Sequence, residues 1–241
     1  MKKIFIDAGH NNSGGDTGAE GNGYKEQDIT FQVSKLVGEL LKQQGLDIKY
    51  SRNNQTDNLG TDVPSSINAR VGMANSWQAD YFISIHCNAF EESGANGTET
   101  LVYGFSGARY ELAKKVQAEI VNTLGTTNRG VKERTNLGVL NNTKMPAIII
   151  ELAFITNIND CEKLIRRQSD FAKAICKGIC NYLNIQFAEV IPVPEPHWAQ
   201  KHLDSLVAKG LVETPAKWQE FDNPVTKGLV LALVDKATSK I

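Results

Sequence analysis

The sequence predicts an α/β fold with a single twisted, mostly parallel sheet, helices on both of its faces, and a small, mainly helical C-terminal module. Two observations predict the sheet and its helices. The first is a series of short apolar runs typical of buried strands, and the second is a series of longer segments, alternating with these runs, whose apolar residues recur every three or four positions. Alternating strands and helices form parallel sheets that helices cover on both faces. A third observation separates the module, because three prolines within residues 186–196 interrupt this alternation.

The first half of the chain is expected to contain three strands and two helices. They are a strand over 4–8, a helix over 26–44, a strand over 46–50, a helix from Ser65 or Ser66 to about Trp77, and a strand over 81–86. A polar, glycine-rich loop joins the first strand to the first helix. That helix carries an apolar stripe that includes Ile29, Val33, Leu36 and Leu40, and Gly45 ends it.

The second half is expected to contain three further strands and two helices. They are a strand over 97–103, a helix over 108–124, a loop carrying Arg129 and Gly130, a short strand over 137–140, a strand over 147–152, and a helix over 170–183. Thr98, Thr100 and Val102 alternate along the first of these strands, as residues on one face of a strand do. The run "AIIIEL" at 147–152 is strongly strand-like.

The length of 241 residues suits one large domain with a small appendage. We expect a large domain over 1–185, a proline-rich linker over 186–196 and a helical module over 197–241. A unit of about 40–50 residues buries little apolar surface on its own. We therefore expect the module to dock on the large domain or to associate with a second copy of the chain, as in a homo-oligomer.

Charge and hydropathy narrow the class of partner. The net charge is −1, so the chain has no strong general attraction for nucleic acid or for an anionic membrane, and we expect neither as a partner. The first apolar run ends at Asp7, which is too short for the hydrophobic region of a signal peptide, and we expect synthesis in the cytoplasm without a classical export signal. Cys176 and Cys180 are four residues apart in a helical pattern, so we expect free thiols there.

Three of the expected strands end on residues that bind metals or move protons. The runs are "FIDAGH", "FISIH" and "AIIIE", which end on His10, His86 and Glu151. The carboxyl ends of parallel strands meet at one edge of a sheet, so these three side chains are expected to lie together. Glu26 opens the first helix after the glycine-rich loop. It either faces the same edge or stabilises the helix N-terminus.

Two histidines and one carboxylate, with one position left open, are typical of a catalytic zinc site. A further carboxylate can act as general base and then as general acid. From the residue types alone, Glu26 and Glu151 are interchangeable in these two roles. A histidine after a strand is also common as a plain loop or capping residue, so the spacing by itself is a weak signal.

The stretches that carry these residues resemble the zinc-dependent N-acetylmuramoyl-L-alanine amidases over about residues 1–185. The resemblance lies in "FIDAGH", "ADYFISIHCNAF" and "MPAIIIELAFITN", which occur in that order. It implies that His10, Glu26 and His86 hold one zinc ion and that Glu151 is the catalytic general base and acid. It also implies that Asn88, in the same block as His86, helps to hold the substrate.

The implied reaction is hydrolysis of the amide between the lactyl group of N-acetylmuramic acid and L-alanine of the peptidoglycan stem peptide. Arg129 is expected either to contact a sugar or stem-peptide carboxylate, or to have a structural role. Arg52 and Arg70 are expected to be structural and to pair with acids. The chain departs from the family pattern at Ala8, where proline is usual, and in the spacing "HNNSGG" after the first strand.

The C-terminal module resembles an S-layer-homology motif, with "HWA" near its start and "FDNPVTKGLVLALV" near its end. Such motifs imply attachment to secondary cell-wall polymers, and plain association between chains is the alternative. The resemblance as a whole implies a phage or prophage endolysin or an autolysin that acts at the bacterial cell wall after release. Two rivals are a zinc peptidase that cuts within the stem peptide and a non-catalytic wall-binding protein.

Overall fold

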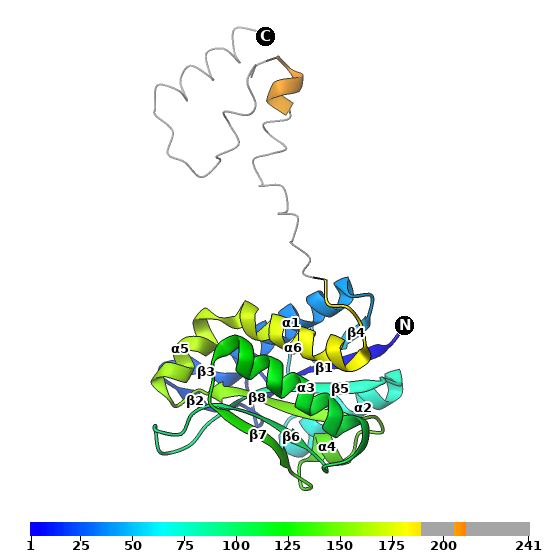
Figure 1. The fold of residues 1–241 in the computed structure, drawn as a ribbon. Helices are drawn as coiled ribbons and strands as arrows, with labels where there is room; N and C mark the ends of the chain where they lie inside the picture. The colour runs from blue at the N-terminus through cyan, green and yellow to red at the C-terminus, as the bar shows by residue number, and fades with distance from the viewer. Residues whose placement is uncertain (189–204, 211–241) are drawn as a thin grey trace. The chain divides into compact units, whose positions relative to one another are not determined.

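The computed structural model describes residues 1–188 and 205–210, and its centre is a six-stranded sheet (Figure 1). The strands lie in the order β4-β1-β5-β8-β6-β7. Their bounds are β1 (Lys3–Ala8), β4 (Asp47–Tyr50), β5 (Tyr81–Asn88), β6 (Thr98–Val102), β7 (Asn128–Glu133) and β8 (Ala147–Phe154). Every neighbouring pair is parallel except β6 and β8, which are antiparallel. The prediction of a mostly parallel sheet is confirmed.

Helices cover both faces of the sheet, as predicted (Figure 1). One face packs against α1 (Glu26–Gln43), α3 (Gly107–Leu124) and α6 (Gln168–Leu183), and the other against α2 (Val63–Trp77) and α4 (Gly138–Asn141). A two-stranded hairpin, β2 (Glu20–Gly21) and β3 (Tyr24–Lys25), lies in the glycine-rich loop before α1. Helix α5 (Ile158–Arg166) follows β8.

The alternation of side chains along the strands divides the core into two clusters. The larger cluster lies against α1, α3 and α6 and includes, from the three central strands, Ile4, Ile6, Ile83, Ile85, Ile148 and Ile150. All six are fully buried, and each contributes roughly 1.5–3 kcal/mol through burial. The smaller cluster, which includes Phe5, Phe82 and Ile149, lies under α2 and α4.

Two segments differ from the sequence expectations because their sequence patterns were misleading. Residues 137–140 were expected to form a strand, but Gly138–Asn141 form the short helix α4, with Val139 and Leu140 buried in the smaller cluster. A four-residue apolar run does not distinguish a buried strand from a buried helical turn. The expected loop around Arg129 is strand β7, which pairs with β6 at the sheet edge. Its largely exposed, polar sequence and Gly130 at a positive φ of 77° hid the strand pattern.

Helix α5 was not among the elements expected from the sequence. Asn157 caps this helix, since its side chain accepts hydrogen bonds from the backbone N–H groups of Asn159 and Asp160. Cys87, Cys161, Cys176 and Cys180 are free thiols, as expected for the helical pair. Among the described helices, none is long and apolar enough to cross a membrane.

The chain divides into two compact units, Met1–Glu189 and Val190–Ile241. In the second unit only residues 205–210 are described, and 205–208 are helical there. Residues 189–196 of the predicted linker, all but these six residues of the predicted C-terminal module, and its wall-attachment motif lie outside the described residues. The boundaries 1–185, 186–196 and 197–241 therefore stay a prediction.

Candidate active site

His10, Glu26 and His86 converge at the carboxyl edge of the sheet. The Oε1 atom of Glu26 lies 3.2 Å from Nε2 of His10 and 3.0 Å from Nδ1 of His86. The two imidazole rings meet edge to face with their centroids 4.8 Å apart. One potential ligand atom from each of the three residues lies within 4.8 Å of the other two. The structure thus brings His10 and His86 to one edge of the sheet, as the strand pattern predicts, although 76 positions separate them, and Glu26 faces the same edge.

Three separate elements supply this cluster. His10 follows β1, Glu26 is the first residue of α1, and His86 lies near the end of β5. Two glycines leave the space that the rings need. A Cβ on Gly9 would lie 2.4 Å from the His86 ring, and one on Gly18 would lie 2.7 Å from Oε2 of Glu26. The glycine-rich loop is thus required for close approach as well as for turning.

The charges of this cluster depend on one another. Burial raises the pKa of the Glu26 carboxyl, but His10 and His86 beside it outweigh burial and hold that pKa well below its usual range. Burial lowers the pKa of His10, but the carboxylates of Asp16 and Glu26 outweigh it and raise that pKa to about 9. The Nδ1 atom of His10 lies 3.2 Å from Oδ1 of Asp16. Asp16 was not singled out from the sequence.

Glu151 lies on β8 directly beside His86 of β5 in the parallel register. Its side chain is therefore on the same face of the sheet as His86. The residue is half-buried, and its Oε2 atom is buried with no hydrogen-bond partner among the described residues. Burial raises the pKa of Glu151 to about 7, with help from the carboxylates of Glu26 and Glu99 and against the opposing effect of His86. A carboxyl group with this pKa can accept and return a proton near neutral pH.

Glu99 flanks Glu151 on the other side, because the two are register partners in the antiparallel pair of β6 and β8. Its Oε2 atom lies 2.7 Å from Nε of Arg129 and 2.6 Å from Nζ of Lys132. Burial raises the pKa of Glu99, but Lys132 and Arg129 outweigh burial and lower it. The sequence did contain a signal for Glu99. Since Thr98 and Thr100 face one side of their strand, the residue between them faces the other.

The remaining candidates lie around this cluster. Asn88 ends β5, and its side chain accepts a hydrogen bond from the N–H of Ala89. Arg129 also packs over the ring of Phe154, 4.9 Å from its centroid. Arg70 pairs with Asp7 at 2.7 Å, as expected of a structural arginine, whereas Arg52 donates to main-chain carbonyls.

A pocket of about 200 Å³ opens beside the two histidines on the α2 and α4 face of the sheet. We call it the apolar pocket, and its apolar wall is formed by Val63, Ile67, Leu137, Val139 and Ile149. The pocket is a concave, mainly apolar site with a few convergent polar groups, which is typical of ligand binding.

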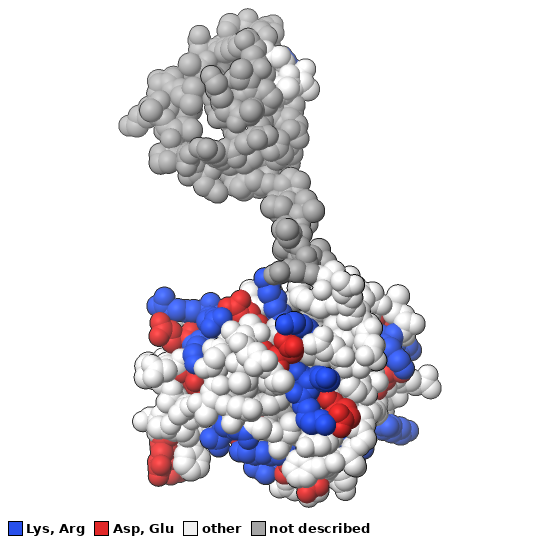
Figure 2. Space-filling model, in the orientation of Figure 1, with Lys and Arg blue, Asp and Glu red and all other residues white. Residues whose placement is uncertain are grey.

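The charged side chains of the large unit form a mixed surface. Lysine and arginine side chains are interspersed with aspartate and glutamate on the face that Figure 2 shows.

Comparison with known proteins identifies the family. Residues 4–181 match the family described as N-acetylmuramoyl-L-alanine amidase. The chain belongs to this amidase family. The amidase CwlM of Bacillus licheniformis is 38% identical over 186 residues, which cover 76% of this chain and 68% of that protein. The endolysin of Bacillus phage SPP1 is 32% identical over 195 residues, which cover 77% of this chain and 67% of that protein.

Solved amidase structures have the same fold. The catalytic domain of the amidase CwlV from Bacillus (Paenibacillus) polymyxa var. colistinus matches with a TM-score of 0.68 at 30% identity. The match covers 77% of this chain and 100% of that one. The family and the fold that the sequence motifs indicated are therefore confirmed, and the chain is a peptidoglycan amidase of this family.

Proposed function

We propose that the chain hydrolyses the amide between N-acetylmuramic acid and L-alanine with one zinc ion, which His10, Glu26 and His86 hold, and with Glu151 as general base and acid. The observation that carries this proposal is the convergence of two imidazoles and one carboxylate beside a second, unpartnered carboxylate. We therefore expect the enzyme to act at the bacterial cell wall, where this substrate lies.

The donor set fits zinc. Zinc is bound by histidine nitrogen and carboxylate oxygen at about 2.0–2.2 Å, and two ligands of a tetrahedral ion are therefore roughly 3.3 Å apart. The distances from Glu26 to His10 and His86, 3.2 Å and 3.0 Å, are close to this separation. Three protein ligands with a fourth position left open are typical of catalytic zinc rather than structural zinc. Asp16 beside His10 is the kind of carboxylate partner that orients a histidine ligand.

The residues of the chain divide the chemistry between them. When bound, the zinc ion supplies a Lewis acid that polarises the scissile carbonyl and lowers the pKa of water to about 7. Glu151 accepts the proton from the attacking water as the carbon–oxygen bond forms. The same carboxyl then gives this proton to the nitrogen of L-alanine as the carbon–nitrogen bond breaks. The buried, unpartnered Oε2 of Glu151 and its pKa of about 7 suit both steps.

Asn88 and Arg129 are proposed as substrate contacts. Asn88 lies two residues after His86 at the end of β5, and Arg129 pairs with Glu99, which lies beside Glu151. For residues 197–241, the likeness to S-layer-homology motifs supports a proposal of attachment to secondary wall polymers. Association of this module with a second chain is the alternative. The names of the relatives, which include amidases and a phage endolysin, support a lytic role for this chain.

Product analysis tests the proposed function. Purified peptidoglycan digested with the full chain should release intact stem peptides with a free L-alanine amino terminus. Cleavage within the stem peptide would show a zinc peptidase instead. Binding to walls with no product, and with no zinc in the purified protein, would favour a non-catalytic wall-binding protein.

A further inference from the structure

His10 has a backbone conformation that histidine rarely adopts. Its φ is +64°, which lies in the left-handed region that favours glycine. Such a conformation persists in a non-glycine residue only where the surroundings hold it. His10 lies two residues after the end of β1, where the chain leaves the sheet, so this φ determines the direction in which its imidazole points.

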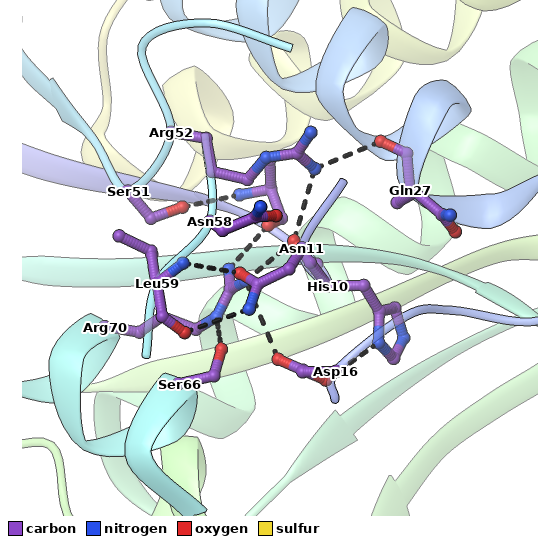
Figure 3. Close-up of polar contacts among 12 residues, drawn as sticks. His10, Asn11, Asp16, Gln27, Ser51, Arg52, Asn58, Leu59, Ser66 and Arg70 are labelled. Atoms are coloured by element: carbon purple, nitrogen blue, oxygen red, sulfur yellow. Dashed lines mark hydrogen bonds and ion pairs between the residues drawn. The ribbon is translucent and has the colours of Figure 1, made fainter. Parts of the chain in front are cut away.

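Two buried arginines hold the carbonyl oxygen of His10, as Figure 3 shows. Nη2 of Arg70 donates to this oxygen at 2.7 Å, and Nη1 of Arg52 donates to it at 3.2 Å. The two arginines come from different elements, since Arg70 lies in α2 and Arg52 follows β4. Arg52 is 0% exposed and Arg70 is 3% exposed, so water does not compete for these bonds.

Each arginine also ties His10 to a neighbouring part of the site. Nη1 of Arg52 donates at 3.1 Å to the carbonyl of Gln27, the residue after Glu26. A single guanidinium therefore links the segments that carry His10 and Glu26. Arg70 donates to the carbonyl of Ala8 at 2.6 Å and lies 3.8 Å from the carboxylate of Asp16, which contacts the imidazole.

The chemistry of Arg52 points to the same role. Arg70 has a carboxylate partner in Asp7, but no carboxylate lies within ion-pair distance of Arg52 in the part of the chain that is described. Its Nε also has no hydrogen-bond partner there. Burying a cation without an ion pair costs free energy. The guanidinium of Arg52 instead donates hydrogen bonds to main-chain carbonyls, including those of His10 and Gln27.

We propose that Arg52 and Arg70 are positioning residues that hold His10 in its left-handed conformation, so that this ligand is aimed at the site before a metal ion arrives. The inference rests on the proposed zinc site. Removing groups that orient a metal ligand weakens metal binding about 10- to 100-fold. The arginines act through His10 and touch neither the metal nor the reacting atoms.

Zinc affinity at matched stability tests the proposal. We compare the zinc dissociation constants of the wild type, Arg52→Gln and Arg52→Lys by competition with a chelator. Val116→Ala, in α3 on the opposite face of the sheet, is the control for lost stability, with urea unfolding measured for every variant. Arg52→Gln should bind zinc about 10- to 100-fold more weakly, Arg52→Lys should recover part of the loss, and Val116→Ala should keep wild-type affinity. Equal affinity in Arg52→Gln and Val116→Ala would overturn the proposal.

A measurement on the metal-free wild type decides the case even if the Arg52 variants do not fold. Backbone amide relaxation by NMR should find His10 as rigid as the residues of β1 before zinc is added. If His10 becomes ordered only when zinc is added, the proposal is wrong. Failure of the wild type to bind zinc at all would instead contradict the proposed function, so the two failures are distinguishable.

Discussion

The two faces of the central sheet have different compositions although they share the same strands. On the α1, α3 and α6 face, β1, β5 and β8 present only apolar side chains and Cys87. On the α2 and α4 face, an apolar residue of each of these strands is followed by polar residues toward the carboxyl end. There, Phe5 is followed by Asp7, Phe82 by Ser84 and His86, and Ile149 by Glu151.

The difference teaches how one sheet combines stability with a reactive site. Polar groups taken out of water cost free energy unless they are paired. Asp7 is paired twice, with Arg70 at 2.7 Å and with the hydroxyl of Ser84 at 2.7 Å. Glu151 is left with a buried, unpartnered oxygen. We therefore expect substitutions on the apolar face to change stability. On the other face, we expect a substitution of the unpartnered Glu151 to change activity and a substitution of the paired Asp7 to change stability.

The largest effect is expected at Glu151. Glu151→Gln keeps the shape of the side chain but cannot accept a proton, so kcat should fall by about 10²- to 10⁴-fold. The melting temperature should not fall, because no hydrogen bond to Oε2 is lost. Hydrolysis of a soluble muropeptide and a thermal melt measure the two quantities. Glu133→Gln, on exposed β7, is the matched control and should keep full activity. Wild-type turnover by Glu151→Gln would refute its catalytic role.

The next effect is expected at Asp7, where the polar face contributes to stability. Asp7→Asn leaves Arg70 buried without its ion-pair partner and should lower the free energy of unfolding by about 3–5 kcal/mol at pH 7. Urea unfolding measures it. The exposed pair of Arg167 and Asp170 supplies the control, since Asp170→Asn should cost no more than about 1 kcal/mol.

The same carboxyl predicts a pH dependence. Burial raises the pKa of Asp7, but Arg70 and the neighbouring hydroxyls outweigh it and lower that pKa below its ordinary value of 3.8. A lowered folded-state pKa means that the stabilisation is complete above the unfolded pKa and is lost as the pH falls through the folded one. The stability difference between wild type and Asp7→Asn should therefore be constant from pH 5 to 7 and shrink below about pH 4. A difference that grew toward low pH would contradict this assignment.

A smaller effect is expected on the apolar face. Ile148→Val removes one methylene from a fully buried residue and should cost about 0.5–1.5 kcal/mol of stability. Activity per folded molecule should not change, because Ile148 faces away from the site. A melt and an active-site-normalised kcat measure the two. A loss of kcat without a loss of stability would break the division between the faces.

The smallest effect is expected at Arg129. Its side chain is 34% exposed, and Lys132 still neutralises Glu99 when it is removed. If Arg129 contacts a carboxylate of the substrate, Arg129→Gln should raise KM by up to about fivefold with little change in kcat. Arg134→Gln, just beyond the far end of β7, is the control and should change neither constant. An unchanged KM in Arg129→Gln would leave the residue with only structural contacts, such as those to Glu99 and Phe154.

The parts of the site that could be predicted from sequence are those at the ends of apolar strands. "FIDAGH", "FISIH" and "AIIIE" identify buried strands by composition, and parallel geometry then brings His10, His86 and Glu151 to one edge. The predictions for these three residues needed only local patterns and one rule of sheet geometry. The start of α1 left Glu26 open between this edge and a plain helix N-terminus, and the resemblance to the amidase family implied its place in the site.

The parts that could not be predicted depend on contacts between distant segments. The left-handed φ of His10 has no local sequence signal, and Arg52 reaches its carbonyl from 42 positions away. Strand β7 is polar and mostly exposed, and α4 is one short turn, so neither has the periodicity that identifies an element. Asp16 lies in a loop whose path is fixed by its pairing with the segment before α2.

The metal content of the purified full chain tests the central claim most directly. We expect one zinc ion per wild-type chain and less than a tenth of that in His86→Ala. We also expect amidase activity to be lost after chelation and to return when zinc is added. Wild-type protein that holds no zinc and still releases stem peptides with a free L-alanine amino terminus would contradict it.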